Sequence, residues 1–363
     1  MTFCPDRGIM HTPFLFLTIL RTTLCACAFL LGLVCPLTSQ ADEAQELYNQ
    51  ALTQVQRQDH QQAAVSLEKA LQIFPRFAAA HHLLGVVSFN ALHQPQEAIR
   101  HLEQAVVLHP NFARAYLDLG LIYQHEGNLD KAKQAMLKAV DIYPRYAEAQ
   151  LNLAFVYDQM KSTQEAITAY QAALKLSPNQ LTALYNLATL YERQGKNDQA
   201  KQQLQQLTEL DPNHSGAWLV LAHLAEKQNQ SDQAIQAYQK ALRVNNDLVD
   251  AHYAMGFLLQ AKNNAQQAAD HFEQVIRINP KHAEAHLNLG VLYANLDRLE
   301  QAEKEYQTAL RLNPKLVEGY YNLGVFYEFY RKDTDRALAQ YRQYVELGGK
   351  DQRVRNLLKK TGP

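Results

Sequence analysis

Cysteine is scarce in this chain, and its distribution excludes several kinds of chemistry. The four cysteines, Cys4, Cys25, Cys27 and Cys35, all lie before Asp42. From Asp42 onward the chain can therefore form no disulfide, no thiolate metal site and no cysteine nucleophile. The same region lacks a glycine-rich phosphate loop, a GxSxG nucleophile elbow and an HExxH zinc motif. We expect no catalytic residues, no metal site, no cofactor and no small-molecule substrate.

An excess of charge of one sign is also lacking. The formal net charge is −1, from 35 Lys and Arg residues against 36 Asp and Glu residues. This balance gives no reason to expect nucleic acid or an acidic membrane surface as a partner. Because 47% of the residues are hydrophobic, the chain has the apolar content of a folded protein.

Long apolar runs are absent except near the start of the chain. Arginines precede an apolar run at 23–37, and the small residues Ser39 and Ala41 follow it. This order is typical of a secretory signal peptide and predicts a leader at 1–41, cleavage after Ala41 and an exported protein, periplasmic or secreted. Two alternatives remain: residues 12–37 anchor an uncleaved chain in a membrane, or a leader cysteine carries a lipid.

Proline, in contrast, recurs at a nearly fixed interval. Successive spacings are 35, 34, 34, 34, 68 and 34 residues, and Asn246 stands where the doubled gap lacks a proline. The prolines concerned are Pro75, Pro110, Pro144, Pro178, Pro212, Pro280 and Pro314. A period near 34 residues predicts stacked helix pairs, none of which buries its apolar face alone.

Each period has the same internal pattern. In the repeat at 147–180, Ala154 stands at position 8, Tyr157 at position 11, Ala166 at position 20 and Pro178 at position 32. Glycine or alanine at position 8 and alanine at position 20 recur along the chain, which allows two helices to approach closely. We interpret the tyrosines at position 11 as core residues, and the proline as the residue that ends the second helix.

This pattern resembles the tetratricopeptide repeat (TPR) family. The resemblance implies an all-α, right-handed α-solenoid of about nine helix-turn-helix repeats, at 44–77, 78–112, 113–146, 147–180, 181–214, 215–248, 249–282, 283–316 and 317–351. We treat 44–351 as one solenoid. The apolar residues Val354, Leu357 and Leu358 then predict a C-terminal capping helix within 352–363.

Histidine and tryptophan invite a functional interpretation, but the repeat register favours a structural one. His282 and His286 are four residues apart, a spacing that suits two metal ligands on one helix. His286 falls at position 4, as does Trp218, and the family packs a half-buried large ring there. We therefore interpret His282, His286, His81 and His82 as structural residues, and Trp218 as a core residue.

The resemblance implies a binding groove lined by the first helix of each repeat. Asparagine at position 6 offers a donor and an acceptor to a peptide backbone, and aromatic residues at positions 5 and 9 offer apolar contacts. The predicted peptide-binding residues are Asn152, Asn186, Asn288, Asn322, Phe155, Tyr185, Tyr253, Phe257 and Tyr321. The alternative is that these asparagines are ordinary features of the repeat, where the phrase NLG or NLA is common.

The predicted function is a non-enzymatic scaffold that binds a partner polypeptide in its concave groove and helps assemble an envelope complex. Position 2 carries acidic residues such as Glu148, Asp250, Glu284 and Glu318, so a neutral or basic segment is favoured. Alternatives are an assembly factor for pili, secretion or exopolysaccharide, and a structural protein that self-assembles as a homo-oligomer. Glycosyltransferases that begin with such repeats are a further class, and we expect no catalytic domain here.

Overall fold

The computed structural model describes residues 36–361, and every regular element in that range is a helix. The predicted leader, 1–41, lies outside the described residues apart from 36–41, which begin the first helix, α2. Within 36–361, no helix combines the length and the apolar character needed to cross a membrane.

The helices form two bodies, one ending at Ser177 and one beginning at Pro178. The N-terminal body contains α2 (Pro36–Gln56), α3 (His60–Ile73), α4 (Ala78–Asn90), α5 (Pro95–Leu108), α6 (Ala113–His125), α7 (Leu129–Ile142), α8 (Ala147–Gln159) and α9 (Thr163–Leu176). The C-terminal body contains α10 (Leu181–Arg193), α11 (Asn197–Leu210), α12 (Ser215–Lys227), α13 (Ser231–Val244), α14 (Val249–Ala261), α15 (Ala265–Ile278), α16 (Ala283–Asn295), α17 (Leu299–Leu312), α18 (Val317–Val325), η1 (Phe326–Arg331), α19 (Thr334–Glu346) and α20 (Gln352–Thr361).

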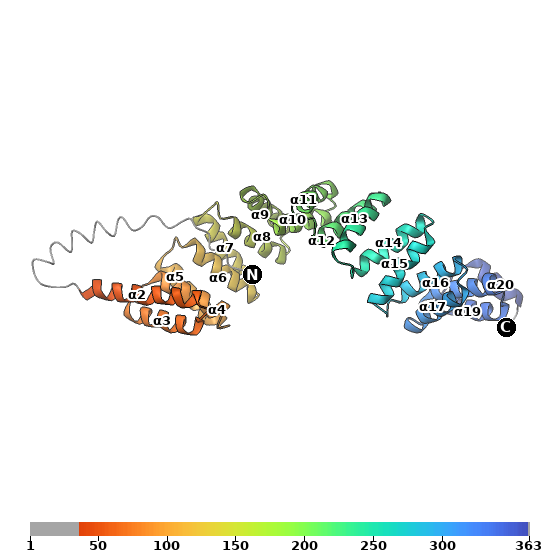
Figure 1. Cartoon of the computed structure of the whole chain (residues 1–363), viewed down its shortest axis with the longest axis horizontal. Helices are drawn as coiled ribbons and strands as arrows, with labels where there is room; N and C mark the ends of the chain where they lie inside the picture. Colours follow the sequence, from red (N-terminus) through yellow and green to blue (C-terminus); the bar gives the residue numbers. More distant parts are fainter. Residues whose placement is uncertain (1–35, 362–363) are drawn as a thin grey trace, which may run out of the picture. The chain divides into compact units, whose positions relative to one another are not determined.

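Two successive helices make one repeat, and consecutive repeats follow one another in chain order inside each body (Figure 1). From α4 onward, the first helix of each pair begins at the first residue of a sequence repeat, whereas α2 begins eight residues before 44, at Pro36. A residue with positive φ turns the chain between the two helices of every repeat. These residues are Gln58, His93, Gly127, Lys161, Gly195, Asn229, Asn263, Asp297 and Lys332.

Position 8 is where the two helices of a repeat come closest. A Cβ atom added to Gly120 would lie 2.7 Å from Cγ of Met136, and one added to Gly290 would lie 2.9 Å from Cδ1 of Tyr306. The facing residue, at position 24, is large and buried in all nine repeats. These residues are Leu67, Leu102, Met136, Tyr170, Leu204, Tyr238, Phe272, Tyr306 and Tyr341. The small residue therefore makes room for the large one, as the sequence pattern predicts.

The tyrosines predicted as core residues at position 11 are largely enclosed. Tyr123, Tyr191, Tyr293 and Tyr327 are buried, and Tyr157 is partly buried. Three of them also donate to a carboxylate on the preceding second helix: Tyr123 to Glu103 at 2.6 Å, Tyr293 to Glu273 at 2.7 Å and Tyr327 to Glu303 at 2.9 Å. Each bond joins neighbouring repeats.

Two repeats contain one extra residue, and the fold absorbs the two insertions differently. In the repeat at 78–112 the loop between α4 and α5 is longer, with His93 at φ 55°. In the repeat at 317–351 the first helix widens into the π-helix η1, where the backbone bonds reach five residues back. Both solutions keep positions 8 and 24 in contact.

The last repeat is covered by α20. Val354 is fully buried, and Leu357 and Leu358 pack against the core of the C-terminal body. Arg353 adds polar anchors, donating to Glu328 at 2.9 Å and to the hydroxyl of Tyr341 at 3.0 Å. This helix shields apolar surface that an internal repeat would cover with its neighbour.

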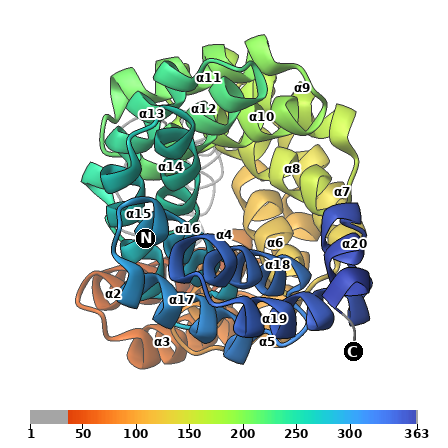
Figure 2. The same cartoon turned by 90° about the vertical axis from the view of Figure 1, so that its right-hand side faces the viewer.

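First helices contact each other between repeats, as α10 contacts α12 and as α4 contacts α6. Within the C-terminal body, Figure 2 shows α12, α14 and α16 on the inner side of α13, α15 and α17. The first helices therefore line the more tightly spaced, concave side of that body, and the second helices line the convex side.

We predict that Gly290→Leu lowers the free energy of unfolding by about 1–3 kcal/mol, because a rigid ring of Tyr306 occupies the space that the new side chain needs. Thermal unfolding followed by circular dichroism measures this effect. Gly290→Ala is the matched control and should cost less, since alanine stands at position 8 in other repeats, as at Ala222. Equal unfolding temperatures for the wild type and the leucine variant would contradict the packing described.

Candidate functional site

The first-helix face of the C-terminal body is the surface at positions 2, 5, 6 and 9 of α10, α12, α14, α16 and α18. An aromatic cluster on α14 is its most exposed apolar feature. Phe257 is 44% exposed, and its ring meets Tyr253 edge-on at 5.0 Å between centroids. Both rings rest against the buried Phe272 of α15. Large rings exposed on a fixed support are typical of contact sites for other molecules.

Asparagine and tyrosine side chains meet between neighbouring first helices of this face. The amide of Asn288 donates to the hydroxyl of Tyr253 at 3.4 Å. Asn186 and Asn322 are partly exposed, and their amides make no hydrogen bond to any residue of 36–361. Two amides of this face are thus available to a ligand, and the third is oriented by a tyrosine.

The tyrosines at position 5 lie over the start of the next repeat. Tyr185 packs on His214 at 4.9 Å, and Tyr253 packs on His282 at 4.8 Å. Both histidines cap the next first helix by accepting a backbone N–H through Nδ1. Tyr321 of the last repeat packs on Tyr344 instead, at 5.3 Å.

The two predicted residues of the N-terminal body lie on α8. Asn152 is partly buried, and its amide donates to the carbonyl of Glu148 in its own helix at 2.8 Å. Phe155 meets the buried Tyr170 edge-on at 5.7 Å. One amide hydrogen of Asn152 is therefore already bonded within its own helix, unlike those of Asn186 and Asn322.

The structure also brings together a charged cluster that sequence patterns did not single out. Asp118, at position 6 of α6, is 8% exposed and accepts from His82 at 2.7 Å and from Arg114 at 3.1 Å. Arg114 also reaches Glu148 at 3.3 Å and Tyr146 at 3.4 Å. Burial alone would lower the pKa of Arg114, but these neighbours raise it. His82 and Asp118 are 36 residues apart in the sequence, and no motif connects them.

Carboxylates border the first-helix face of the C-terminal body. Asp250, Glu284 and Glu318 are exposed at position 2 of α14, α16 and α18. The only one with a nearby basic side chain within 36–361 is Glu284, which lies 3.3 Å from His282. The border is therefore acidic, and it favours a neutral or basic ligand segment.

Rings at position 4 share a different task, which the register had predicted as structural. Five of these rings donate a hydrogen bond to the carbonyl six residues earlier, where the preceding repeat ends. The pairs are His81 with Pro75, Trp218 with Pro212, His252 with Asn246, His286 with Pro280 and Tyr320 with Pro314, at 2.8–3.2 Å. These bonds join consecutive repeats.

The other nitrogen of these histidines meets position 23 of the same repeat. His252 faces His271 at 2.8 Å and His286 faces Glu305 at 2.5 Å, both through Nδ1. Since Nε2–H of His252 donates to Asn246, its Nδ1 accepts and His271 donates. Burial, with the neighbouring His252, lowers the pKa of His271 to about 4. The hydrogen bond to Glu305 instead raises the pKa of His286.

No group of three or more metal-binding side chains occurs within 36–361. His282 caps a helix, His286 pairs with a carboxylate and His81 faces His101 at 3.0 Å. Trp218 differs from its interpretation as core, because it is only partly buried and lines an open groove.

The His252–His271 pair predicts a pH-dependent stability. A histidine whose folded pKa is lowered stabilises the fold above pH 6.5 and loses that contribution as the pH falls from 6.5 toward 4. We predict that His271→Glu, which copies the His286–Glu305 pair, raises the unfolding temperature relative to wild type as the pH falls from 7.5 to 5. Calorimetry at both pH values measures this difference, and Glu305→His should shift it in the opposite direction. A difference in unfolding temperature that does not change with pH would contradict the lowered pKa of His271.

Family models of the tetratricopeptide repeat match most of the chain. They cover 47–76, 111–179, 159–224, 258–323 and 296–352, and a TPR repeat model covers 227–263. No curated protein matches the sequence significantly.

Several solved structures are similar. The C-terminal part of a TPR repeat-containing protein from Cytophaga hutchinsonii is 15% identical, with a TM-score of 0.59, over 67% of this chain and 99% of that one. PilF of Pseudomonas aeruginosa is 24% identical, with a TM-score of 0.47, over 56% and 92% of the two chains. YrrB, described as a TPR protein with an unusual peptide-binding site, is 23% identical, with a TM-score of 0.47, over 52% and 98%.

Proposed function

The chain belongs to the tetratricopeptide repeat family, whose members serve as protein-interaction scaffolds. We propose that it binds an extended segment of a partner protein and does not catalyse a reaction. The proposed site is the first-helix face of the C-terminal body. The observation that supports it most directly is Phe257, 44% exposed beside Tyr253, with the amides of Asn186 and Asn322 unengaged on the same face.

The chemistry of this face indicates the kind of segment that fits. Amides of asparagine pair with backbone N–H and C=O groups of any sequence, so they favour an extended chain. The rings of Tyr253 and Phe257 accept an apolar side chain. The acidic border at Asp250 and Glu284 selects neutral or basic residues beside it.

We predict that residues 42–363 capture a partner from an envelope extract, and that the site variants lose it. One variant carries Asn186→Ala, Asn288→Ala and Asn322→Ala, and the other is Phe257→Ala. Each should retain the partner at least about tenfold less well, because backbone hydrogen bonds or an apolar contact are lost. Quantitative mass spectrometry of the captured proteins is the measurement.

Phe74→Ala is the matched control, since Phe74 is also a partly exposed ring, 39% exposed, but ends a second helix in the N-terminal body. Circular dichroism tests whether each variant is folded. Equal capture by wild type and both site variants would remove the first-helix face as the site and leave the asparagines as features of the repeat.

The proposed setting is an envelope complex, and it rests on the signal-peptide pattern of 1–41. We predict that protein isolated from its own cells begins at Asp42, because Ser39 and Ala41 have the small side chains that signal peptidase requires. Mass spectrometry of the N-terminal peptide after cell fractionation measures this. A peptide from within 1–35 in the purified protein would favour the membrane-anchored alternative.

A further inference from the structure

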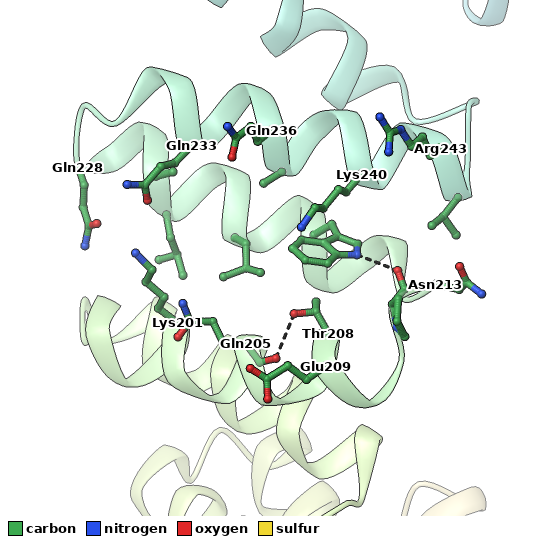
Figure 3. Close-up of a pocket in the computed structure, with 17 residues that line it drawn as sticks. Lys201, Gln205, Thr208, Glu209, Asn213, Gln228, Gln233, Gln236, Lys240 and Arg243 are labelled. Atoms are coloured by element: carbon green, nitrogen blue, oxygen red, sulfur yellow. Dashed lines mark hydrogen bonds between the residues drawn. The ribbon is translucent and has the colours of Figure 1, made fainter.

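A groove opens on the opposite side of the C-terminal body, between two second helices. Lys201, Gln205 and Glu209 of α11 form one wall, and Gln233, Gln236, Lys240 and Arg243 of α13 form the other (Figure 3). Trp218 and Leu221 of α12 belong to its apolar floor. The volume is about 880 Å³, within the range of about 300–1,000 Å³ that is typical of ligand sites. We call it the second-helix groove.

A short side chain at position 23 borders the groove. In the two following repeats, His271 or Glu305 occupies that position and meets the ring at position 4. Here position 23 is Ala237, which is too short to reach Trp218. The indole N–H is fixed by the carbonyl of Pro212 at 2.8 Å. The ring therefore stays in place, and the space beside it is left to Lys240, whose Nζ lies 4.1 Å from the ring centroid.

The charges of the groove are unbalanced. Lys201, Lys240 and Arg243 line it with a single carboxylate, Glu209, and none of the three cations forms an ion pair with a residue of 36–361. Some cations elsewhere on this body are paired between repeats. Examples are Lys262 with Asp232, and Arg277 with Asp247 at 2.9 Å. Three unpaired cations around an apolar floor form a site for a negatively charged ligand.

We propose that the second-helix groove binds a short acidic segment of a protein, in which aspartate or glutamate residues flank an apolar one. The acidic side chains would meet Lys201, Lys240 and Arg243 on the walls, and the apolar side chain would lie on Trp218 and Leu221. This site is separate from the first-helix face, and its charge preference is the opposite. The proposal therefore stands whether or not the first-helix face binds a partner.

A peptide fits these walls better than an acidic polysaccharide does. The glutamines of the walls offer donors and acceptors to backbone amides, and the floor is apolar where a sugar chain would present hydroxyl groups. Gln228 lies at one end of the groove, with Asn213 toward the other (Figure 3).

Trp218 provides the measurement, because it is the only tryptophan in the chain. The probe is the blocked peptide acetyl-Asp-Glu-Leu-Asp-Glu-amide, which contains no tryptophan and adds little absorbance. Titration into residues 42–363 should change the tryptophan emission saturably, and 500 mM NaCl should weaken the binding. The uncharged peptide acetyl-Asn-Gln-Leu-Asn-Gln-amide and the acidic polysaccharide polygalacturonate are the comparison ligands.

Two variants test the groove. The double variant Lys240→Gln with Arg243→Gln should raise the Kd about tenfold, because two charge-assisted contacts are lost. Ala237→Glu places a carboxylate in the groove, three residues from Lys240 on α13, and should abolish binding. Arg277→Gln removes a cation that is already paired outside the groove and should leave the Kd unchanged. Circular dichroism shows whether each variant is folded.

Saturable binding of the acidic peptide that the groove variants weaken and Arg277→Gln does not would establish the site. No saturable change in emission, or equal binding of the uncharged peptide, would overturn the proposal. Equal binding of polygalacturonate would also overturn it, because the groove would then recognise negative charge rather than a peptide. An unchanged Kd in the folded double variant would exclude these two cations and has the same consequence.

Discussion

The close approach of two helices at position 8 is the contact on which the rest of the structure depends. A glycine or alanine there lies under a large buried residue at position 24, as Gly120 lies under Met136 and Gly290 under Tyr306. No single repeat can bury both of its faces, so each repeat needs its neighbour. The π-helix η1 shows how strong this constraint is, since the backbone widens to keep Gly324 against Tyr341.

The stacked repeats present two surfaces with different chemistry. First helices approach one another on the concave side, where rings such as Tyr253 and amides such as Asn288 meet between repeats. Second helices lie on the convex side. His271 and Glu305 at position 23 meet the ring at position 4 of their own repeats, whereas Ala237 lines an open groove beside Trp218. The C-terminal body thus carries an acidic-bordered concave face and a basic convex groove.

Position 4 illustrates how much of a site a sequence pattern predicts. The register predicted that His286 and Trp218 are structural, and both donate to the end of the preceding repeat. The same register did not predict that Trp218 lines an open groove, which it shares with Ala237, 19 residues later in the chain. Likewise, Asp118 accepts from Arg114 of its own helix and from His82, which belongs to another repeat.

The sequence by itself determined the helical repeat, because the period of 34 residues predicts stacked helix pairs and the small residues at position 8 allow the two helices of a pair to approach closely. It also determined which residues carry amides and rings at positions 5 and 6. Only the tertiary structure decided which of these groups are engaged. Within 36–361, Asn152 bonds to its own helix while Asn186 and Asn322 make no hydrogen bond through their amides, and Lys240 has no acidic partner while Lys262 has one. The reason is physical: hydrogen bonds and ion pairs between repeats depend on side chains that lie some 30 to 36 residues apart, and no local pattern encodes their distance.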